Sequence, residues 1–192
     1  MPEEKVSGAV MDLITKIRDK DPSVRAEARD NAGKVGAPAV KLLAEVMTDP
    51  EFEVAREAER ALWKIVRHAG RPKADSERKA VVTELIPLLG DSQPVRVKRE
   101  AMWMLSEIAE DEAIEPVASQ LSDKELREDA RMVLERLPGK KSLAALQMAL
   151  KTVPEEFRIN VAQSLRARGV TVPGLPSQKL VPTRKTELQP VE

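Results

Sequence analysis

Two tryptophans and four arginines in the central part of the chain are the residues best suited to binding a ligand. They are Trp63 and Trp103, with Arg56, Arg60, Arg67 and Arg99. A guanidinium can donate paired hydrogen bonds to a carboxylate or a phosphate, and an indole ring offers apolar area and a face for cations. Both residue types are enriched where binding energy concentrates. The cluster therefore predicts a groove for an acidic or phosphorylated segment of another protein.

Residues suited to catalysis are scarce. The chain has no cysteine, and its one histidine, His68, lies near the end of a predicted helix, where the helix dipole favours a positive charge. One histidine without cysteine cannot build a typical zinc site, and no phosphate loop or nucleophile motif is present. We interpret the acidic run around Glu110 as a solvated helix junction. We therefore predict no catalytic residue, no metal site and no cofactor, in a protein that is not an enzyme.

A phrase that recurs five times indicates which elements carry these residues. It begins with an apolar anchor, has a basic residue next in four copies, and places a small residue at +4 and apolar residues at +8 and +11, except that Arg168 stands at +11 of the fifth copy. These offsets fall on one face of an α-helix. A fixed period of about 30 residues is typical of a stacked repeat array. The anchors are Val24, Val54, Val97, Leu126 and Phe157, spaced 30, 43, 29 and 31 residues apart.

A second apolar-periodic segment precedes each copy, so each repeat is predicted to be a pair of helices, A and B. The A helices are expected at 9–19, 38–48, 77–89, 111–121 and 140–151, and the B helices at 22–35, 51–69, 94–109, 123–137 and 155–168. Asp21 before Pro22 and two capping boxes, beginning at Ser122 and Thr152, predict helix starts. Left-handed helix ends are predicted at five glycines: Gly36, Gly70, Gly90, Gly139 and Gly169. The longest anchor spacing predicts a longer second B helix and a longer loop after it.

The end of the chain departs from the repeat. Residues 170–192 contain four prolines and no helical pattern, which predicts a flexible tail behind a repeat array of residues 1–169. One hypothesis is that this tail folds back into the groove, with Glu187 and Glu192 meeting arginines. Its deletion should then raise the affinity for a partner.

The helical period also predicts which B-helix positions face away from the core. At ~100° per residue, offsets +2, +6, +9 and +13 lie opposite the buried stripe. The two tryptophans and the four arginines occupy such offsets. The alternative is that each B helix touches neighbours on both sides and buries the tryptophans. The predicted partner-binding residues are Arg56, Arg60, Trp63, Arg67, Arg99, Trp103 and Met132, across the second to fourth repeats.

The phrase resembles the HEAT-repeat superfamily, especially the short bacterial HEAT-like repeats named from phycobilisome lyases. The resemblance rests on an Asp, a Val-Arg pair and an Ala at set spacing, as in Asp21-Pro-Ser-Val24-Arg25-Ala-Glu-Ala28, and it spans residues 9–169. It implies an all-α fold, a right-handed α-α superhelix (solenoid) of about five HEAT-like helix pairs, with the B helices on the concave side. It also implies that the basic residues after the anchors bridge neighbouring repeats: Arg25, Lys98, Arg127 and Arg158.

Composition narrows the function classes. The 192 residues carry 32 basic and 32 acidic side chains, so net charge does not favour nucleic acid. No apolar run approaches the ~20 residues that span a bilayer, and the start lacks a signal-peptide core, so we expect a cytoplasmic protein. The leading hypothesis is a non-catalytic protein–protein interaction scaffold, monomeric by default, that binds a protein partner or peptide segment on its concave B-helix surface. A nucleic-acid-binding HEAT-like protein is the alternative, and a bilin lyase-like enzyme or its accessory chaperone is the weaker one.

Overall fold

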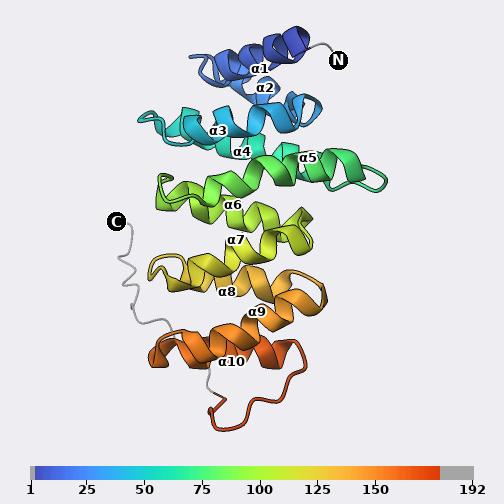
Figure 1. Cartoon of the computed structure of the whole chain (residues 1–192). Coiled ribbons are helices and arrows are strands. Elements are labelled where there is room, and N and C mark those ends of the chain that lie inside the picture. Colours follow the sequence, from blue (N-terminus) through green and yellow to red (C-terminus); the bar gives the residue numbers. More distant parts are fainter. Residues whose placement is uncertain (1–2, 178–192) are drawn as a thin grey trace, which may run out of the picture.

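The computed structural model describes residues 3–177, with side chains from Ser7 onward, and shows a stack of short helices (Figure 1). The α-helices are α1 (Glu3–Ile17), α2 (Pro22–Val35), α3 (Val40–Val46), α4 (Phe52–Ala69), α5 (Asp75–Leu85), α6 (Val95–Ile108), α7 (Ile114–Ser119), α8 (Arg127–Arg136), α9 (Gly139–Thr152) and α10 (Glu155–Ala167). Turns of 3-10 helix extend α3, α5 and α7: η1 (Ala37–Ala39), η2 (Ile86–Leu89), η3 (Asp111–Ala113) and η4 (Gln120–Ser122). Within this described part, no helix is long and apolar enough to cross a membrane.

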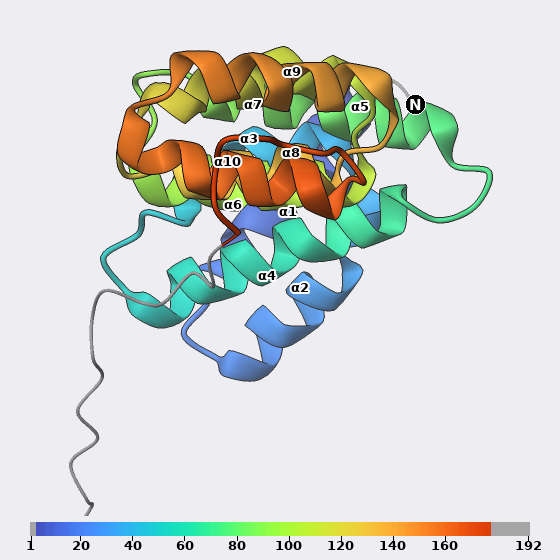
Figure 2. The ribbon, with the colours of Figure 1, turned by 90° about the horizontal axis from the view of Figure 1, so that it is seen from below.

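The helices form two layers. Seen along the stack, α5, α7 and α9 line up on one side and α6, α8 and α10 on the other (Figure 2). The odd-numbered helices correspond to the predicted A helices and the even-numbered helices to the predicted B helices. The prediction of an all-α solenoid built from five helix pairs is therefore confirmed.

The core between the layers is thin and follows the repeated phrase. The residue at +4 is buried in every repeat. The leucines at +8 are at most 1% exposed, and each such burial stabilises the fold by about 2 kcal/mol. These leucines are Leu62, Leu105, Leu134 and Leu165. Small and aliphatic side chains fill these layers, which explains why the chain needs few aromatic residues.

The side-chain cap predicted at Asp21 is confirmed, whereas the two predicted capping boxes are wrong. Asp21 caps α2, because its carboxylate accepts a hydrogen bond from the amide of Ser23 (2.8 Å). The capping boxes at Ser122 and Thr152 do not form, since both hydroxyls donate back to carbonyls of the preceding helical turn. Helix α8 begins only at Arg127, four residues later than predicted, whereas α10 begins at Glu155 as predicted.

The glycines at helix ends serve two purposes. Three have the positive φ that favours glycine: Gly36 (74°), Gly139 (92°) and Gly169 (79°). Gly70 and Gly90 were also predicted to be left-handed, and that prediction is wrong, because their φ values are −78° and −63°. At Gly70 the requirement is space, since a Cβ there would lie 2.9 Å from the Ile108 side chain.

The longest anchor spacing is explained as predicted. Helix α4 has 18 residues, more than any other described helix, and a loop of five residues separates it from α5. In this loop Lys73 has a φ of 67°. Arg71 donates two hydrogen bonds to the carboxylate of Glu77 in α5 (2.7 and 2.5 Å), which ties the loop down.

The beginning of the predicted tail packs against the array. Val170 and Val172 are partly buried against the core, and Arg166 of α10 donates hydrogen bonds to the carbonyls of Val172 (3.2 Å) and Leu175 (2.6 Å). Residues 170–177, which we call the end segment, cross the open end of the array beneath α10 (Figure 2). The prediction of a tail that leaves the array at residue 170 therefore needs correction up to Ser177. The remaining tail residues, 178–192, lie outside the described residues.

Candidate functional site

The face formed by the even-numbered helices, which we call the B-helix face, carries polar contacts between successive repeats. The residue three places after each anchor is acidic in four repeats and an amide in the fifth: Glu27, Glu57, Glu100, Asp129 and Asn160. Three of these carboxylates accept a hydrogen bond from the preceding B helix, Glu57 from Arg29, Glu100 from Trp63 and Asp129 from Trp103. We call this series the inter-repeat ladder. The acidic residue three places after the anchor is the sequence signal from which the inter-repeat ladder could have been predicted, and the sequence-based prediction did not include this ladder.

Trp63 lies partly buried between α4 and α6. Its indole nitrogen donates to Glu100 Oε2 (3.2 Å), and the Arg67 guanidinium lies over its ring, 5.5 Å from the centroid. Burial, together with the nearby charge of Glu59, raises the pKa of Glu100 above its ordinary value, and the hydrogen bond from Trp63 opposes that rise. Trp63 therefore packs against the core and also stabilises a carboxylate that is short of water.

Trp103 occupies the equivalent junction one repeat further along. Its indole nitrogen donates to Asp129 Oδ1 (3.1 Å), and Arg99 donates to the other oxygen of the same carboxylate (2.8 Å). The Arg136 guanidinium lies over the Trp103 ring, 5.8 Å from the centroid. Trp103 thus uses its indole N–H within the protein, and Arg99 uses Nε and Nη2 to bind Asp129 and the carbonyl of Glu125.

A groove of about 370 Å³ opens on the B-helix face between α2 and α4. Four of the side chains that line it are cationic, one is a carboxylate and one is an indole. We call it the basic groove, and its residues are Arg29, Asp30, Arg60, Trp63, Lys64 and Arg67. It lies over the contact between two B helices. These helices can approach closely because Gly33 has no side chain, and a Cβ there would lie 2.9 Å from the Cβ of His68.

The single carboxylate of the basic groove is already neutralised. Asp30 accepts hydrogen bonds from Arg29 and lies 3.0 Å from the ammonium of Lys64. The hydrogen bonds from Arg29, followed by that from Lys64, hold the pKa of Asp30 at about 2. This carboxylate therefore stays ionised at any physiological pH, and it offsets part of the charge of its two partners.

The arginines of the basic groove differ in how fully they are paired. Arg29 and Arg60 each lie 3.0 Å from an oxygen of the buried Glu57 carboxylate. Arg67 is exposed, contacts the Trp63 ring, and has no carboxylate within ion-pair distance in the part of the chain that the structure describes. The guanidinium of Arg67 is thus the cation most open to a ligand.

The structure distributes the seven predicted binding residues over the B-helix face. Arg60, Trp63 and Arg67 line the basic groove, whereas Arg56 pairs with Glu53 and lies over the Phe52 ring. The predicted groove spans the second and third repeats, and the groove present spans the first and second. Arg29 and Lys64, which complete it, were missed because each lies one residue away from an offset taken to face outward.

Met132, the one apolar member of the predicted set, is 37% exposed on α8. It lies on the B-helix face but does not line the basic groove. An exposed thioether offers a soft apolar contact without charge.

The basic residues after the anchors do not all bridge repeats, as the resemblance implied. Arg127 does, because it lies 3.2 Å from Glu156 at the start of α10. Arg25 donates instead to two carbonyls of the loop before its own helix, and Lys98 approaches Asp91 of the loop before α6. For Arg25 and Lys98, the basic side chain fixes the loop within a repeat.

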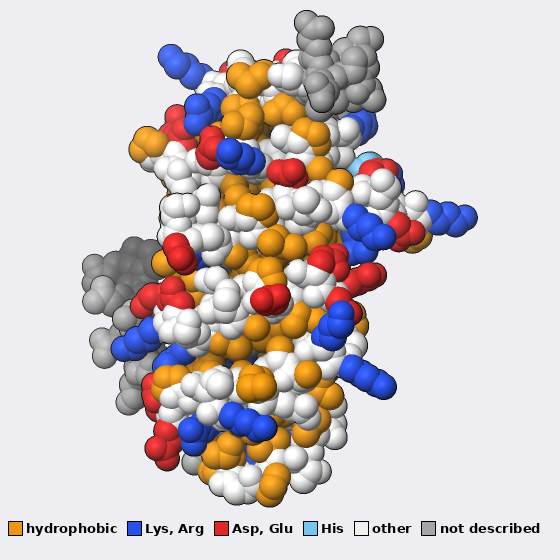
Figure 3. Space-filling model, viewed as in Figure 1, with side chains coloured by type: hydrophobic (Ala, Val, Ile, Leu, Met, Phe, Trp, Pro, Cys, Tyr) orange, Lys and Arg blue, Asp and Glu red, His pale blue; other side chains and the backbone are white. Residues whose placement is uncertain are grey.

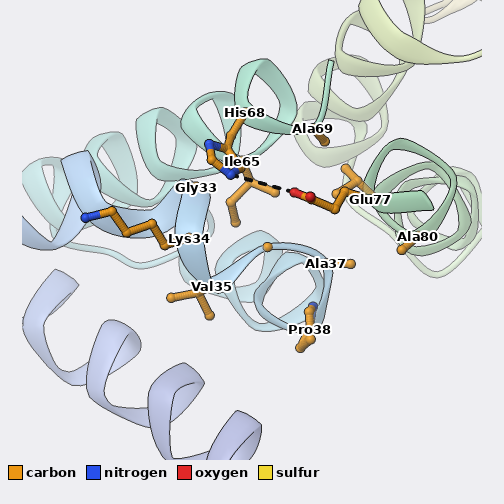
Figure 4. Close-up of a pocket in the computed structure, with 12 residues that line it drawn as sticks. Gly33, Lys34, Val35, Ala37, Pro38, Ile65, His68, Ala69, Glu77 and Ala80 are labelled. Atoms are coloured by element: carbon orange, nitrogen blue, oxygen red, sulfur yellow. Dashed lines mark ion pairs between the residues drawn. The ribbon is translucent and has the colours of Figure 1, made fainter. Parts of the chain in front are cut away.

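A second cavity, of about 250 Å³, lies where the ends of α2 and α4 meet α5 (Figure 4). His68 Nε2 lies 3.7 Å from Glu77 Oε2 at its edge, and the lining is otherwise largely apolar. The Glu77 carboxylate is engaged by Arg71, and that hydrogen-bonded pairing lowers the pKa of Glu77. Among residues 3–177 no group of three or more histidine or acidic side chains is arranged to hold a metal ion.

The face seen in Figure 3 has a different character. Apolar side chains form a band along the stack, bordered by scattered charges (Figure 3). A hollow of about 380 Å³ between α7 and α9 contains Met148, which is 60% exposed, and no charged residue lines it. This hollow therefore lacks the groups that would select a charged ligand, which the basic groove has.

Stacked helix pairs, a thin aliphatic core and an open polar face define an α-helical repeat protein. Residues 82–166 match the family model of HEAT repeats, in agreement with the resemblance of the repeated phrase to these repeats. No curated protein sequence matches the chain.

Solved structures with a similar arrangement of helices include two groups of designed proteins. One is a designed armadillo repeat protein in complex with the peptide (KR)4, at 20% identity over 85% of both chains, with a TM-score of 0.45. Another is a set of computationally designed armadillo repeat proteins for modular peptide recognition, at 20% identity over 85% of this chain and 86% of theirs, with a TM-score of 0.46. These are general likenesses of fold, and the site is argued from the residues of this chain alone.

Proposed function

We propose that this protein is a non-catalytic interaction scaffold whose basic groove binds an acidic or phosphorylated segment of a partner protein. The observation that carries the proposal is the gathering of four cations around one neutralised carboxylate and one indole on α2 and α4. Oxygen anions are the ligands that such a set recognises best.

Three side chains of the basic groove would contact the ligand, each in a way that follows from its chemistry. Arg67, which has no carboxylate partner among the described residues, takes the first anionic group of the ligand. Arg60 is half exposed and can turn part of its donor set from Glu57 towards a second anion. The exposed part of the Trp63 ring provides apolar contact beside them, so a segment in which acidic and apolar residues alternate fits the groove.

A titration tests this assignment. The probe is a short fluorescein-labelled peptide of alternating Glu and Leu, compared with the same peptide carrying phosphoserine in place of Glu and with one carrying Lys. We expect the two anionic peptides to bind and the Lys peptide not to bind. Arg67→Glu should weaken binding at least about tenfold, because a hydrogen-bonded charge pair is replaced by like-charge repulsion.

The control is Lys41→Glu, which makes the same charge change at an exposed lysine of α3, in the other layer. Its affinity should stay near that of the unchanged protein. Equal weakening by both variants would show that only net charge matters. Tighter binding of a single-stranded oligonucleotide than of either anionic peptide, with a steep salt dependence, would favour nucleic acid as the ligand instead.

A further inference from the structure

The end segment shows how this protein holds an extended stretch of its own chain. Arg166 donates to the carbonyls of Val172 and Leu175, and Gln163 Nε2 lies 3.4 Å from the hydroxyl of Ser177. Gln163 and Arg166 occupy offsets +6 and +9 of the fifth B helix. The same offsets of the second B helix are Arg60 and Trp63, which line the basic groove. The described chain thus ends on the B-helix face, at the position equivalent to the groove.

The chain beyond Ser177 is long enough to reach that groove. Helices packed side by side lie about 8–10 Å apart, so α4 is three steps, roughly 30 Å, from α10. An extended chain advances about 3.3 Å per residue, so the ten residues from Ser177 to Glu187 span roughly 33 Å.

The charge of the last residues also matches the basic groove. Residues 186–192 contain Glu187 and Glu192 and no basic side chain, whereas Lys179, Arg184 and Lys185 all precede them. The acidic and apolar residues of this stretch, Glu187, Leu188, Val191 and Glu192, have the composition that the groove is proposed to select.

We propose that residues 178–192 continue along the B-helix face and that residues 186–192 occupy the basic groove of the same molecule, in competition with the partner. The proposal rests on the proposed function, because it names what covers the same groove when no partner is bound. The first contacts of this path are those that Gln163 and Arg166 make with the end segment.

A contact-quenching experiment on the full chain tests the path. The chain has no cysteine, so Leu188→Cys gives a single site for a bimane dye, whose fluorescence tryptophan quenches on contact. In a Trp103→Phe background Trp63 is the only tryptophan. We expect the dye at 188 to brighten at least about twofold when Trp63→Phe removes the quencher. With Trp63 present, the dye should also brighten when Arg67→Glu is introduced, or at high salt, because both weaken the attraction between the charges.

The matched control is a bimane on Met148→Cys, in the other layer, whose brightness should not respond to these changes. A dye at 188 that also ignores them would overturn the proposal. Quenching that fades on dilution would also overturn it, because the tail would then lie in the groove of a second copy.

Competition separates this inference from the proposed function. With an effective concentration of about 1 mM and an intrinsic Kd of about 100 µM, an occupying tail should weaken the partner about tenfold. The Glu/Leu peptide should therefore bind about tenfold more tightly to Glu187→Gln/Glu192→Gln than to the unchanged chain, whereas Lys179→Gln should not have this effect. Equal affinity for all three proteins would overturn the inference and leave the proposed function standing. Quenching at 188 without binding of any peptide would support the inference and contradict the proposed function.

Discussion

At the scale of single residues, Trp63 combines apolar packing with a hydrogen bond to Glu100, and the two contributions can be separated. In Trp63→Phe the ring remains but the partly buried carboxylate loses a donor, so we expect a loss of about 1–2 kcal/mol in the free energy of unfolding at pH 7. Trp103→Phe should cost less, because Arg99 still donates to Asp129. Urea denaturation measures both.

The pH dependence of that loss identifies its cause. The folded-state pKa of Glu100 is raised, so the contribution of this group is fully favourable below its ordinary pKa and declines as pH rises through the folded pKa. Removal of the indole donor raises that pKa further. The cost of Trp63→Phe should therefore be small near pH 4 and larger at pH 7, whereas an equal cost at both would show that only packing changed.

The pH dependence of binding follows from Asp30. Because the pKa of Asp30 is about 2, the charge of the basic groove does not change through this residue between pH 4 and pH 8. A Glu-containing peptide should keep its affinity down to about pH 4.5, where its own carboxylates protonate. A phosphoserine peptide should weaken already below about pH 6, the second pKa of the phosphate. Anisotropy titrations over this range would contradict the groove assignment if both peptides lost affinity together near neutral pH.

At the scale of helices, Arg131 joins α8 to α10. Its side chain, 8% exposed, donates to Glu128 and Glu135 of its own helix and to the buried hydroxyl of Ser164 in α10. Arg131→Met would leave these groups without a buried cation, so we expect a loss of about 3 kcal/mol. Arg136→Met breaks the exposed pair with Glu107 and should cost less than about 1 kcal/mol. Denaturant unfolding of the two variants checks the contrast, and a similar loss in both would show that burial of the pair is unimportant.

The same interface should respond to acid. Burial opposes ionisation of Glu128, but hydrogen bonds from Arg131 and Asn160 outweigh it and keep the pKa of Glu128 below its ordinary value. This contribution is present above the ordinary pKa and is lost as pH falls through the lower folded pKa. Since Glu128 is partly exposed, solvent screening keeps the effect modest.

Helix positions could be predicted from the sequence because the buried stripe is a property of each helix alone. Leu105 and Leu134 recur at +8 whatever the neighbouring repeats do, and most observed helices follow the predicted ranges, although α1 begins six residues earlier and α8 four residues later than predicted. The lining of the basic groove depends on how one B helix is rotated against the next. That rotation is not contained in the period of either helix, so Arg29 and Lys64 were missed.

Hydroxyl capping failed for a similar reason. Ser122 and Thr152 each lie between two helices. In both cases the hydroxyl donates to a carbonyl of the preceding helical segment and does not accept from an amide of the following helix. A local motif cannot decide between two such partners.

At the scale of the whole molecule, the end segment closes one end of the array. Open ends of a solenoid expose apolar layers, so a covering element stabilises the last repeat. Truncation after Gly169 removes Val170, Val172 and the carbonyls that Arg166 binds, and we expect it to cost about 2–3 kcal/mol.

Truncation after Ser177 is the matched control, because it keeps the end segment and removes only the residues proposed to reach the basic groove, so it should cost no more than about 1.4 kcal/mol. Hydrogen exchange should show the added loss of protection concentrated in α9 and α10. Equal stability of the two truncated proteins would mean that the end segment covers α10 without stabilising it.

The inter-repeat ladder also bears on how such an array can change over generations. Arg29 is at +5, Trp63 at +9 and Trp103 at +6, so the first three junctions use donors at three different offsets to reach the acceptor at +3. If the third repeat were excised, Trp63 would face Asp129, whose side chain is one methylene shorter than that of Glu100. Each of these junctions therefore fits one particular neighbouring repeat. Addition of repeats at the ends of the array should be tolerated far more readily than exchange, loss or duplication of repeats in its middle.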